Sequence, residues 1–199
     1  MIYRKFATGN ARRVRAMRSG KIEVFAILGL TLILIGFSAI PAFTAQNQAL
    51  SITSPAFRNG DTIPTRYTCS GENISPALKW NDVPQKTESI ALIVDDPDAP
   101  NGMFVHWVFF NLPAGAGGLP ENVRPSKTAE GGTQGLNGRG QVGYTGPCPP
   151  PGAPHHYHFR LYALDRKLSL NSAAGASEVE SGLKGHVLAA SELVGIFGR

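Results

Sequence analysis

The chain has 199 residues, of which 42% are hydrophobic and 17% are charged, and its formal net charge is +5. This length can hold one well-buried domain and an appendage. Residues 1–43 carry seven basic groups and one acid, which leaves twelve basic and thirteen acidic groups for the rest. The near-neutral remainder lacks the basic surface that nucleic-acid binding needs, so no nucleic-acid partner is expected.

The first 43 residues have the composition of an export or anchoring segment. Residues 1–21 contain seven Lys/Arg and no acid, and Val24–Ile40 is then apolar apart from Gly, Thr and Ser. This pattern is typical both of a cleaved signal peptide and of an uncleaved membrane anchor over residues 22–40. In either case the positive charges predict export of the remainder, to the periplasm or beyond the cell.

After a short polar linker at residues 44–50, residues 51–199 are expected to form one β-rich domain. Short apolar runs alternate there with Gly, Pro, Asn and Asp, as they do in all-β proteins. The clearest strands are expected at Ser89–Asp95, Phe104–Leu112 and His156–Leu164.

The strand at residues 104–112 is apolar on both faces, which predicts a central position between two packed layers. Strict alternation places one set of side chains on a single face: Phe104, His106, Val108, Phe110 and Leu112. An isolated histidine in such a strand more often belongs to the core than to a binding site.

The histidine-rich sequence at residues 155–158 also divides by alternation. His155 and Tyr157 share one face of an extended strand, roughly 6.5–7 Å apart, whereas His156 and His158 point to the other. A metal site built from all three histidines is therefore not expected, and no metal ligand is assigned.

Two further segments lie on either side of this strand. Residues 131–143 hold six glycines and are expected to form a mobile or extended loop. Near the C-terminus, Ser177 and Glu180 fit a helix capping box, and apolar residues from Val179 to Val194 follow at helical spacing. One broken helix or two short helices are expected there, covering an edge of the β core.

The cysteines Cys69 and Cys148 lie in the part that is expected to be exported. A disulfide between them would close a long loop and contribute about 4–5 kcal/mol on the chain-entropy model. Two buried thiols are the alternative, because the sequence does not show whether the Cα atoms approach each other.

Two turn segments carry side chains suited to ligand binding. Asp96 follows a strong strand and precedes Pro97 and Pro100, a place where a carboxylate either caps a turn or meets a ligand. The segment GYTGPCPPPG is expected to form a rigid wall, and its Gly143, Gly146 and Gly152 would leave backbone N–H groups accessible to anions.

Taken together, several segments resemble the phosphatidylethanolamine-binding protein family, in its bacterial branch called Raf kinase inhibitor-like. The matching segments cover almost all of residues 50–199 and are YTCSGENISPALKW, DDPDAP, HWVFFNL, GYTGPCPPPGAPHHYHFRLYALD and KGHVLAASELVGIFG. The resemblance implies a mainly β fold, a β-sandwich of antiparallel sheets with peripheral C-terminal helices.

The resemblance also implies a surface pocket for phosphate-type head groups. Carried over by motif, the ligand-binding residues are Asp96, Ala99, Pro100, His106, Gly146, Pro149, Pro150, His155 and Tyr157. The chain departs from the family at position 156, where His replaces an expected Arg that faces away from the pocket. This change is expected to affect stability or a partner surface more than ligand binding.

The expected function is extracytoplasmic binding of a small anionic or zwitterionic ligand such as phosphoethanolamine, without a cofactor. The phosphate would accept hydrogen bonds from Tyr157, His106 or His155 and from loop amides. Asp96 would either hold a histidine in its required form or bind a ligand ammonium, and both roles stay open. If a protonated histidine is needed, binding weakens above roughly pH 7.

Two other classes of function are weighed against ligand binding. A protein-interaction or inhibitor module, acting on a partner in the cell envelope, is the alternative. A hydrolase is disfavoured because the sequence has no G-x-S-x-G nucleophile motif and no metal-ligand spacing, so no catalytic residue is assigned.

Overall fold

The computed structural model describes residues 49–199, so the predicted signal peptide or anchor lies outside the described residues. The elements in chain order are β1 (Ser51–Thr53), a 3₁₀ turn (Thr65–Tyr67), β2 (Leu78–Asn81), β3 (Ser89–Asp96), β4 (Phe104–Pro113), β5 (Gly118–Leu119), β6 (Thr128–Ala129), β7 (Gly132–Gln134), β8 (His155–Leu164), α1 (Ala176–Leu183) and β9 (Val187–Phe197). Within residues 49–199, no helix combines the length and the apolar composition needed to cross a bilayer.

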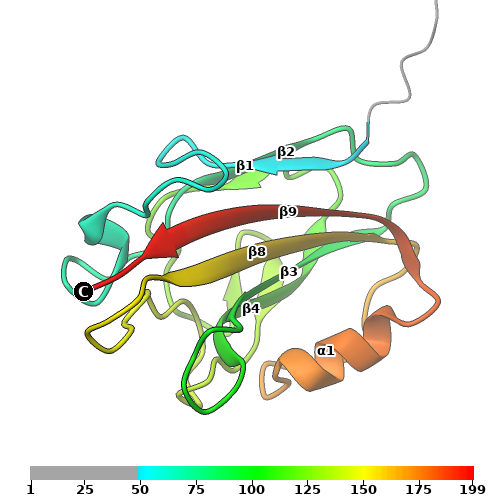
Figure 1. Ribbon diagram of the computed structural model, residues 1–199. Coiled ribbons are helices and arrows are strands. Elements are labelled where there is room, and N and C mark those ends of the chain that lie inside the picture. Colours follow the sequence, from blue (N-terminus) through cyan, green and yellow to red (C-terminus); the bar gives the residue numbers. More distant parts are fainter. Residues whose placement is uncertain (1–48) are drawn as a thin grey trace, which may run out of the picture. The chain divides into compact units, whose positions relative to one another are not determined.

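The strands form two antiparallel sheets that pack face to face (Figure 1). One sheet has the strand order β1–β2–β5, and the other has the order β6–β7–β4–β3–β8–β9. Helix α1 lies against the opposite face of the six-stranded sheet (Figure 1). The prediction of a mainly β sandwich of antiparallel sheets is therefore confirmed.

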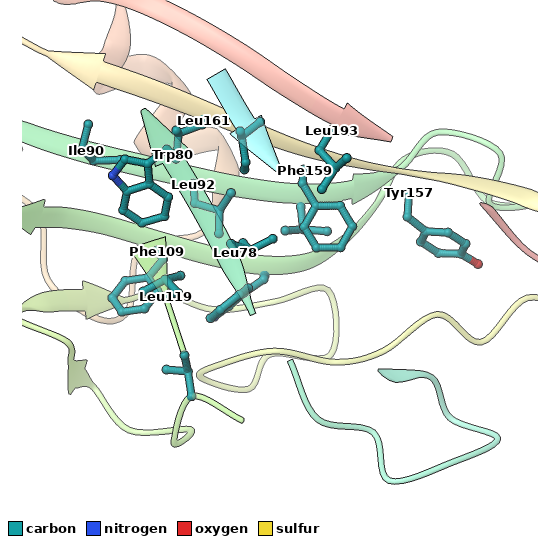
Figure 2. Packing of buried hydrophobic residues seen from close by; sticks show 14 of the residues in the cluster. Leu78, Trp80, Ile90, Leu92, Phe109, Leu119, Tyr157, Phe159, Leu161 and Leu193 are labelled. Atoms are coloured by element: carbon teal, nitrogen blue, oxygen red, sulfur yellow. The ribbon is translucent and has the colours of Figure 1, made fainter. Parts of the chain in front are cut away.

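Strands β3 and β4 are apolar on both faces because each face meets a separate layer. In β3, Leu92 and its neighbours two residues away join the cluster between the two sheets, whereas Ala91 and Ile93 join the cluster beneath α1. Figure 2 shows side chains of the inter-sheet cluster, with Tyr157 at one end and its hydroxyl directed away from the others. Each large apolar side chain buried in this way contributes about 1.5–3 kcal/mol.

Strand β4 does not keep the strict alternation that the sequence predicts. Trp107 pairs with Val94 and Val105 pairs with Asp95, so His106 is an extra residue on β4. This two-against-one pairing is a β-bulge, which turns the side chain of the extra residue.

The irregularities in β4 change which residues share a face. The ring of His106 lies 5.1 Å from the ring of Tyr157, on the inter-sheet side, whereas Val108 packs beneath α1. A second irregularity follows at Asn111, whose φ is 57°, and Leu112 consequently joins the inter-sheet cluster. The predicted common face for His106, Val108 and Leu112 is therefore wrong.

The C-terminal region contains one helix followed by a long strand. Helix α1 begins at Ala176, and the Glu178 carboxylate accepts a hydrogen bond from the Gly175 N–H, so the predicted capping box at Ser177 is wrong. Val179 and Leu183 lie in α1 as predicted, whereas the predicted helical residues from Val187 to Val194 lie in β9, which pairs with β8 along its whole length. The apolar spacing fitted both structures, and pairing with the edge of β8 decided between them.

Two other expectations also need correction. The Gly-rich stretch, expected to be a mobile or extended loop, contains regular structure: residues 132–134 form β7, which pairs with β4, and a bridge joins Leu136 to Val142. Leu50, which the sequence placed in a polar linker, is 5% exposed and packs in the inter-sheet cluster. The domain core therefore begins one residue earlier than predicted.

Candidate functional site

A cavity of about 280 Å³ opens where β3 ends and β8 begins. Segments far apart in the sequence form its lining, which consists of Asp96, Ala99, Pro100, Asn101, Gly102, Met103, Phe104, His106, Arg139, Cys148, Pro149, Pro150 and His155. The structure thus brings seven of the nine predicted site residues together in the lining. Gly146 and Tyr157 are not part of the lining.

Asp96 holds both the turn after β3 and the ring of His155. Its Oδ1 accepts a hydrogen bond of 2.9 Å from the Asp98 N–H, and its Oδ2 lies 2.8 Å from Nδ1 of His155. Both side chains are buried, at 3% and 8% exposure. Because both carboxylate oxygens are engaged, the geometry matches the first of the two roles considered for Asp96, that of holding a histidine.

His106 is fixed in one tautomer by the wall opposite to it. Its Nδ1 lies 2.7 Å from the carbonyl oxygen of Thr145, which can only accept, so Nδ1 carries the proton. Burial lowers the pKa of His106, although the Thr145 carbonyl opposes this shift. The ring is therefore neutral near pH 7, and its Nε2 is a hydrogen-bond acceptor rather than the donor that the sequence suggested.

Tyr157 lies beneath the cavity rather than in its lining. The side chain is fully buried, and its ring packs edge-on against His106 and stacks on His155. Its hydroxyl has no hydrogen-bond partner among residues 49–199 and points away from the core (Figure 2). Burial and the nearby Asp96 carboxylate raise the pKa of Tyr157, so the hydroxyl stays protonated.

Residues 145–149 of the proline-rich wall are each bonded to another segment of the chain. The Thr145 N–H donates to the His106 carbonyl, and Cys148 forms a disulfide with Cys69, whose Cα lies 5.4 Å away. Further bonds join Cys69 N–H to the Pro147 carbonyl, Gly146 N–H to Oδ1 of Asn73, and Arg199 Nε to the Pro149 carbonyl. This wall can therefore keep its shape without a ligand.

The N–H of Gly146 already donates to Asn73, so it is not free to bind an anion. Gly146 instead allows close packing of the wall against a neighbouring turn. A Cβ atom at position 146 would lie 2.5 Å from the carbonyl oxygen of Tyr67 and 2.9 Å from Cα of Thr68. We expect Gly146→Ala to lower the free energy of unfolding by about 1–3 kcal/mol, because backbone atoms must move. Urea unfolding measures this loss; Gly115→Ala, at a site with open space around it, is the matched control and should change little.

With this geometry in place, comparison with known proteins identifies the family. The family model described as phosphatidylethanolamine-binding protein matches residues 53–198. The chain belongs to this family. A protein of Methanothermobacter thermautotrophicus, named only as a UPF0098 protein, is 48% identical over 151 residues, which are 75% of this chain and 99% of that protein.

Two solved structures of the phosphatidylethanolamine-binding protein family share the fold. A putative homologue from Chlamydia trachomatis, CT736, is 38% identical, with a TM-score of 0.71 over 76% of this chain and 98% of its own. YbcL of Escherichia coli, described as a new member of the mammalian family, is 34% identical, with a TM-score of 0.72 over 76% of this chain and 99% of its own.

His156, which stands where the family resemblance led us to expect Arg, faces away from the cavity. Its Nδ1 and its backbone N–H both lie 2.8 Å from Oδ2 of Asp98. His158 bonds instead to Glu192, at 2.9 Å. The alternation predicted for this strand is confirmed: His155 lies on the cavity side of β8, and His156 and His158 lie on the other.

Arg139 is a charged lining residue, able to bind an anion, that was not predicted from the sequence. It stands in the Gly-rich stretch at residues 131–143, where it is the single charged side chain. A lone charged residue in a Gly-rich stretch was the available signal. Strand alternation, however, does not predict which part of the fold a loop residue contacts. Met103 and Phe104, which add apolar lining, were not assigned to the site either.

Proposed function

We propose that this protein binds a small zwitterionic phosphate compound, of the kind found in phospholipid head groups, in the cavity at the end of β3 and β8. One observation carries the proposal: His106 and His155 both line the cavity with Nδ1 already engaged. Each ring is thus held by a protein acceptor and leaves Nε2 for a ligand.

The size and lining of the cavity support a ligand of this kind. Its volume of about 280 Å³ lies near the lower end of the ~300–1,000 Å³ range of small-molecule sites. Apolar side chains of Met103, Phe104 and three prolines surround the few polar groups. A head group fits this mixture, because the carbon atoms between its phosphate and its ammonium can contact the apolar wall.

We further propose that binding, rather than catalysis, is the role of the cavity. Among the described lining residues none is Ser, Thr or Lys, and the one cysteine, Cys148, is held in a disulfide. The lining thus offers no hydroxyl, free thiol or amine as a nucleophile, and the Asp96 carboxylate is already bonded at both oxygens. The disulfide also supports an extracytoplasmic location, because such bonds persist in oxidising surroundings.

His155→Gln tests the proposal directly. We expect the full-length protein to bind phosphoethanolamine, and the substitution to weaken binding by about 10- to 100-fold, because a charge-assisted hydrogen bond is worth about 1.5–3 kcal/mol. His158→Gln is the matched control: it makes the same change three residues further along β8, on the face away from the cavity, and it should leave affinity unchanged. Isothermal titration calorimetry measures both.

Two outcomes of these titrations would contradict the proposal. Wild-type protein that binds neither phosphoethanolamine nor inorganic phosphate would refute the proposed function. Equal affinity of the His155 and His158 variants would exclude the imidazole from the site.

A further inference from the structure

Arg139 stands at the tip of a tight hairpin that a single asparagine organises. The Oδ1 of Asn137 accepts hydrogen bonds from the backbone N–H groups of Arg139 and Gln141, at 2.9 and 3.2 Å. Its Nδ2 donates to the Gly143 carbonyl, and a β-bridge joins Leu136 to Val142. The backbone of Arg139 is therefore held in place in the absence of ligand.

The side chain of Arg139 is exposed to solvent and borders the cavity, where its Nε donates a hydrogen bond of 3.1 Å to Oγ1 of Thr145. Thr145 in turn bonds twice to His106, through its N–H and its carbonyl oxygen. One threonine thus ties the guanidinium to the imidazole across the cavity wall, and the Nη groups of Arg139 have no carboxylate within 4.0 Å among residues 49–199.

The ionisable side chains that line the cavity differ in their charge and in whether they are already bonded to other residues. Both oxygens of Asp96 are occupied by protein donors, and His106 is uncharged. Arg139 is, among the described lining residues, the one cation that keeps its charge at every accessible pH. Its remaining N–H groups can meet two phosphate oxygens at once, which neither imidazole can do.

We infer that Arg139 binds the anionic group of the ligand and selects phosphate-bearing compounds, while Nε2 of His106 accepts a hydrogen bond from the ligand's donor group. This inference rests on the proposed function and adds an orientation to it. The phosphate lies at the Arg139 side, and the ammonium or hydroxyl lies toward His106. The sequence suggested Tyr157, a histidine and loop amides as donors to the phosphate, and the inference adds Arg139 to them.

Calorimetry of Arg139 variants with two probes tests the inference. The probes are glycerophosphoethanolamine, whose phosphodiester keeps one negative charge throughout the working pH range, and inorganic phosphate. We expect Arg139→Gln to weaken binding of both by about 10-fold or more, and Arg139→Lys to weaken it less, because a lysine keeps the charge without the fork. Arg124→Gln, an exposed arginine outside the lining, is the control and should bind as wild type does.

The outcomes separate this inference from the function on which it rests. Wild-type affinity for both probes in Arg139→Gln, with His155→Gln impaired, would overturn the inference and leave the binding function standing. No binding of phosphoethanolamine or of either probe by wild-type protein would overturn both, and binding of phosphoethanolamine without binding of either probe would overturn the inference alone. A lowered melting temperature in Arg139→Gln with equal losses in Arg139→Lys would show a structural role for the side chain, and would also overturn the inference.

Discussion

Replacing both Cys69 and Cys148 by serine is expected to lower the free energy of unfolding by about 4–5 kcal/mol. The disulfide joins residues 79 positions apart, and such a cross-link removes loop-closure entropy from the unfolded chain. This loss is a large share of the ~5–15 kcal/mol by which a domain is normally stable. Urea unfolding of the oxidised wild type and of the double variant measures the difference.

The folded cavity wall should survive this change. Gly146 stays bonded to Asn73, and the carbonyls of Pro147 and Pro149 keep their donors at Cys69 and Arg199. The effect therefore falls mainly on the unfolded state, and ligand affinity should change much less than stability. Adding a thiol reductant is the internal control, because it should destabilise wild type and leave the double variant unaffected. A loss below about 1 kcal/mol would contradict the entropic account.

The sequence could predict those features that depend on local period and composition. Alternation assigned His155 to one face of β8 and His156 to the other, because side chains in a regular strand follow a period of two. The β-rich sandwich followed from short apolar runs between turn residues, together with the family resemblance. Seven of the predicted site residues line one cavity because the strand ends and turns that carry them lie at the same end of the six-stranded sheet.

The features that could not be predicted depend on contacts between distant segments. The bulge at His106 exists because β4 pairs with β3 in a shifted register, and this shift turns His106 toward Tyr157. Strand β9 had an apolar spacing that suits a helix, and its partner β8 decided the outcome. Arg139 reaches the cavity because Asn137 folds the hairpin back, which no periodicity encodes.

Asp95→Asn is expected to raise the free energy of unfolding near pH 7 by about 3 kcal/mol. Asp95 is fully buried at the end of β3, and neither of its oxygens has a hydrogen-bond partner among the described residues, although Nη1 of Arg160 lies 3.0 Å from Oδ2. Burial raises the pKa of Asp95 to about 6, against the attraction of Arg160 and His158 and with help from Glu180 and Glu192. The charged form is therefore unfavourable in the folded state.

The sign of the pH dependence follows from this shift. Between the ordinary pKa of 3.8 and the folded value of about 6, the folded protein binds more protons at Asp95 than the unfolded chain does. Stability from this group is thus complete below about pH 4, falls as the pH rises, and is lost above pH 6. A difference of about 2 pKa units corresponds to about 3 kcal/mol, and asparagine mimics the protonated acid at every pH.

Urea unfolding at several values between about pH 4 and pH 8 should show a flatter stability profile for Asp95→Asn than for wild type. Arg160 keeps its contact with Glu192, 3.1 Å away, so the substitution does not leave an unpaired buried cation. Asp98→Asn is the matched control and should have the opposite sign, because hydrogen bonds from His156 lower the pKa of Asp98. The stability that Asp98 contributes is lost as the pH falls, and it is small because the side chain is half-exposed. A less stable Asp95→Asn near pH 7 would mean that attraction to Arg160 outweighs the cost of burying the carboxylate.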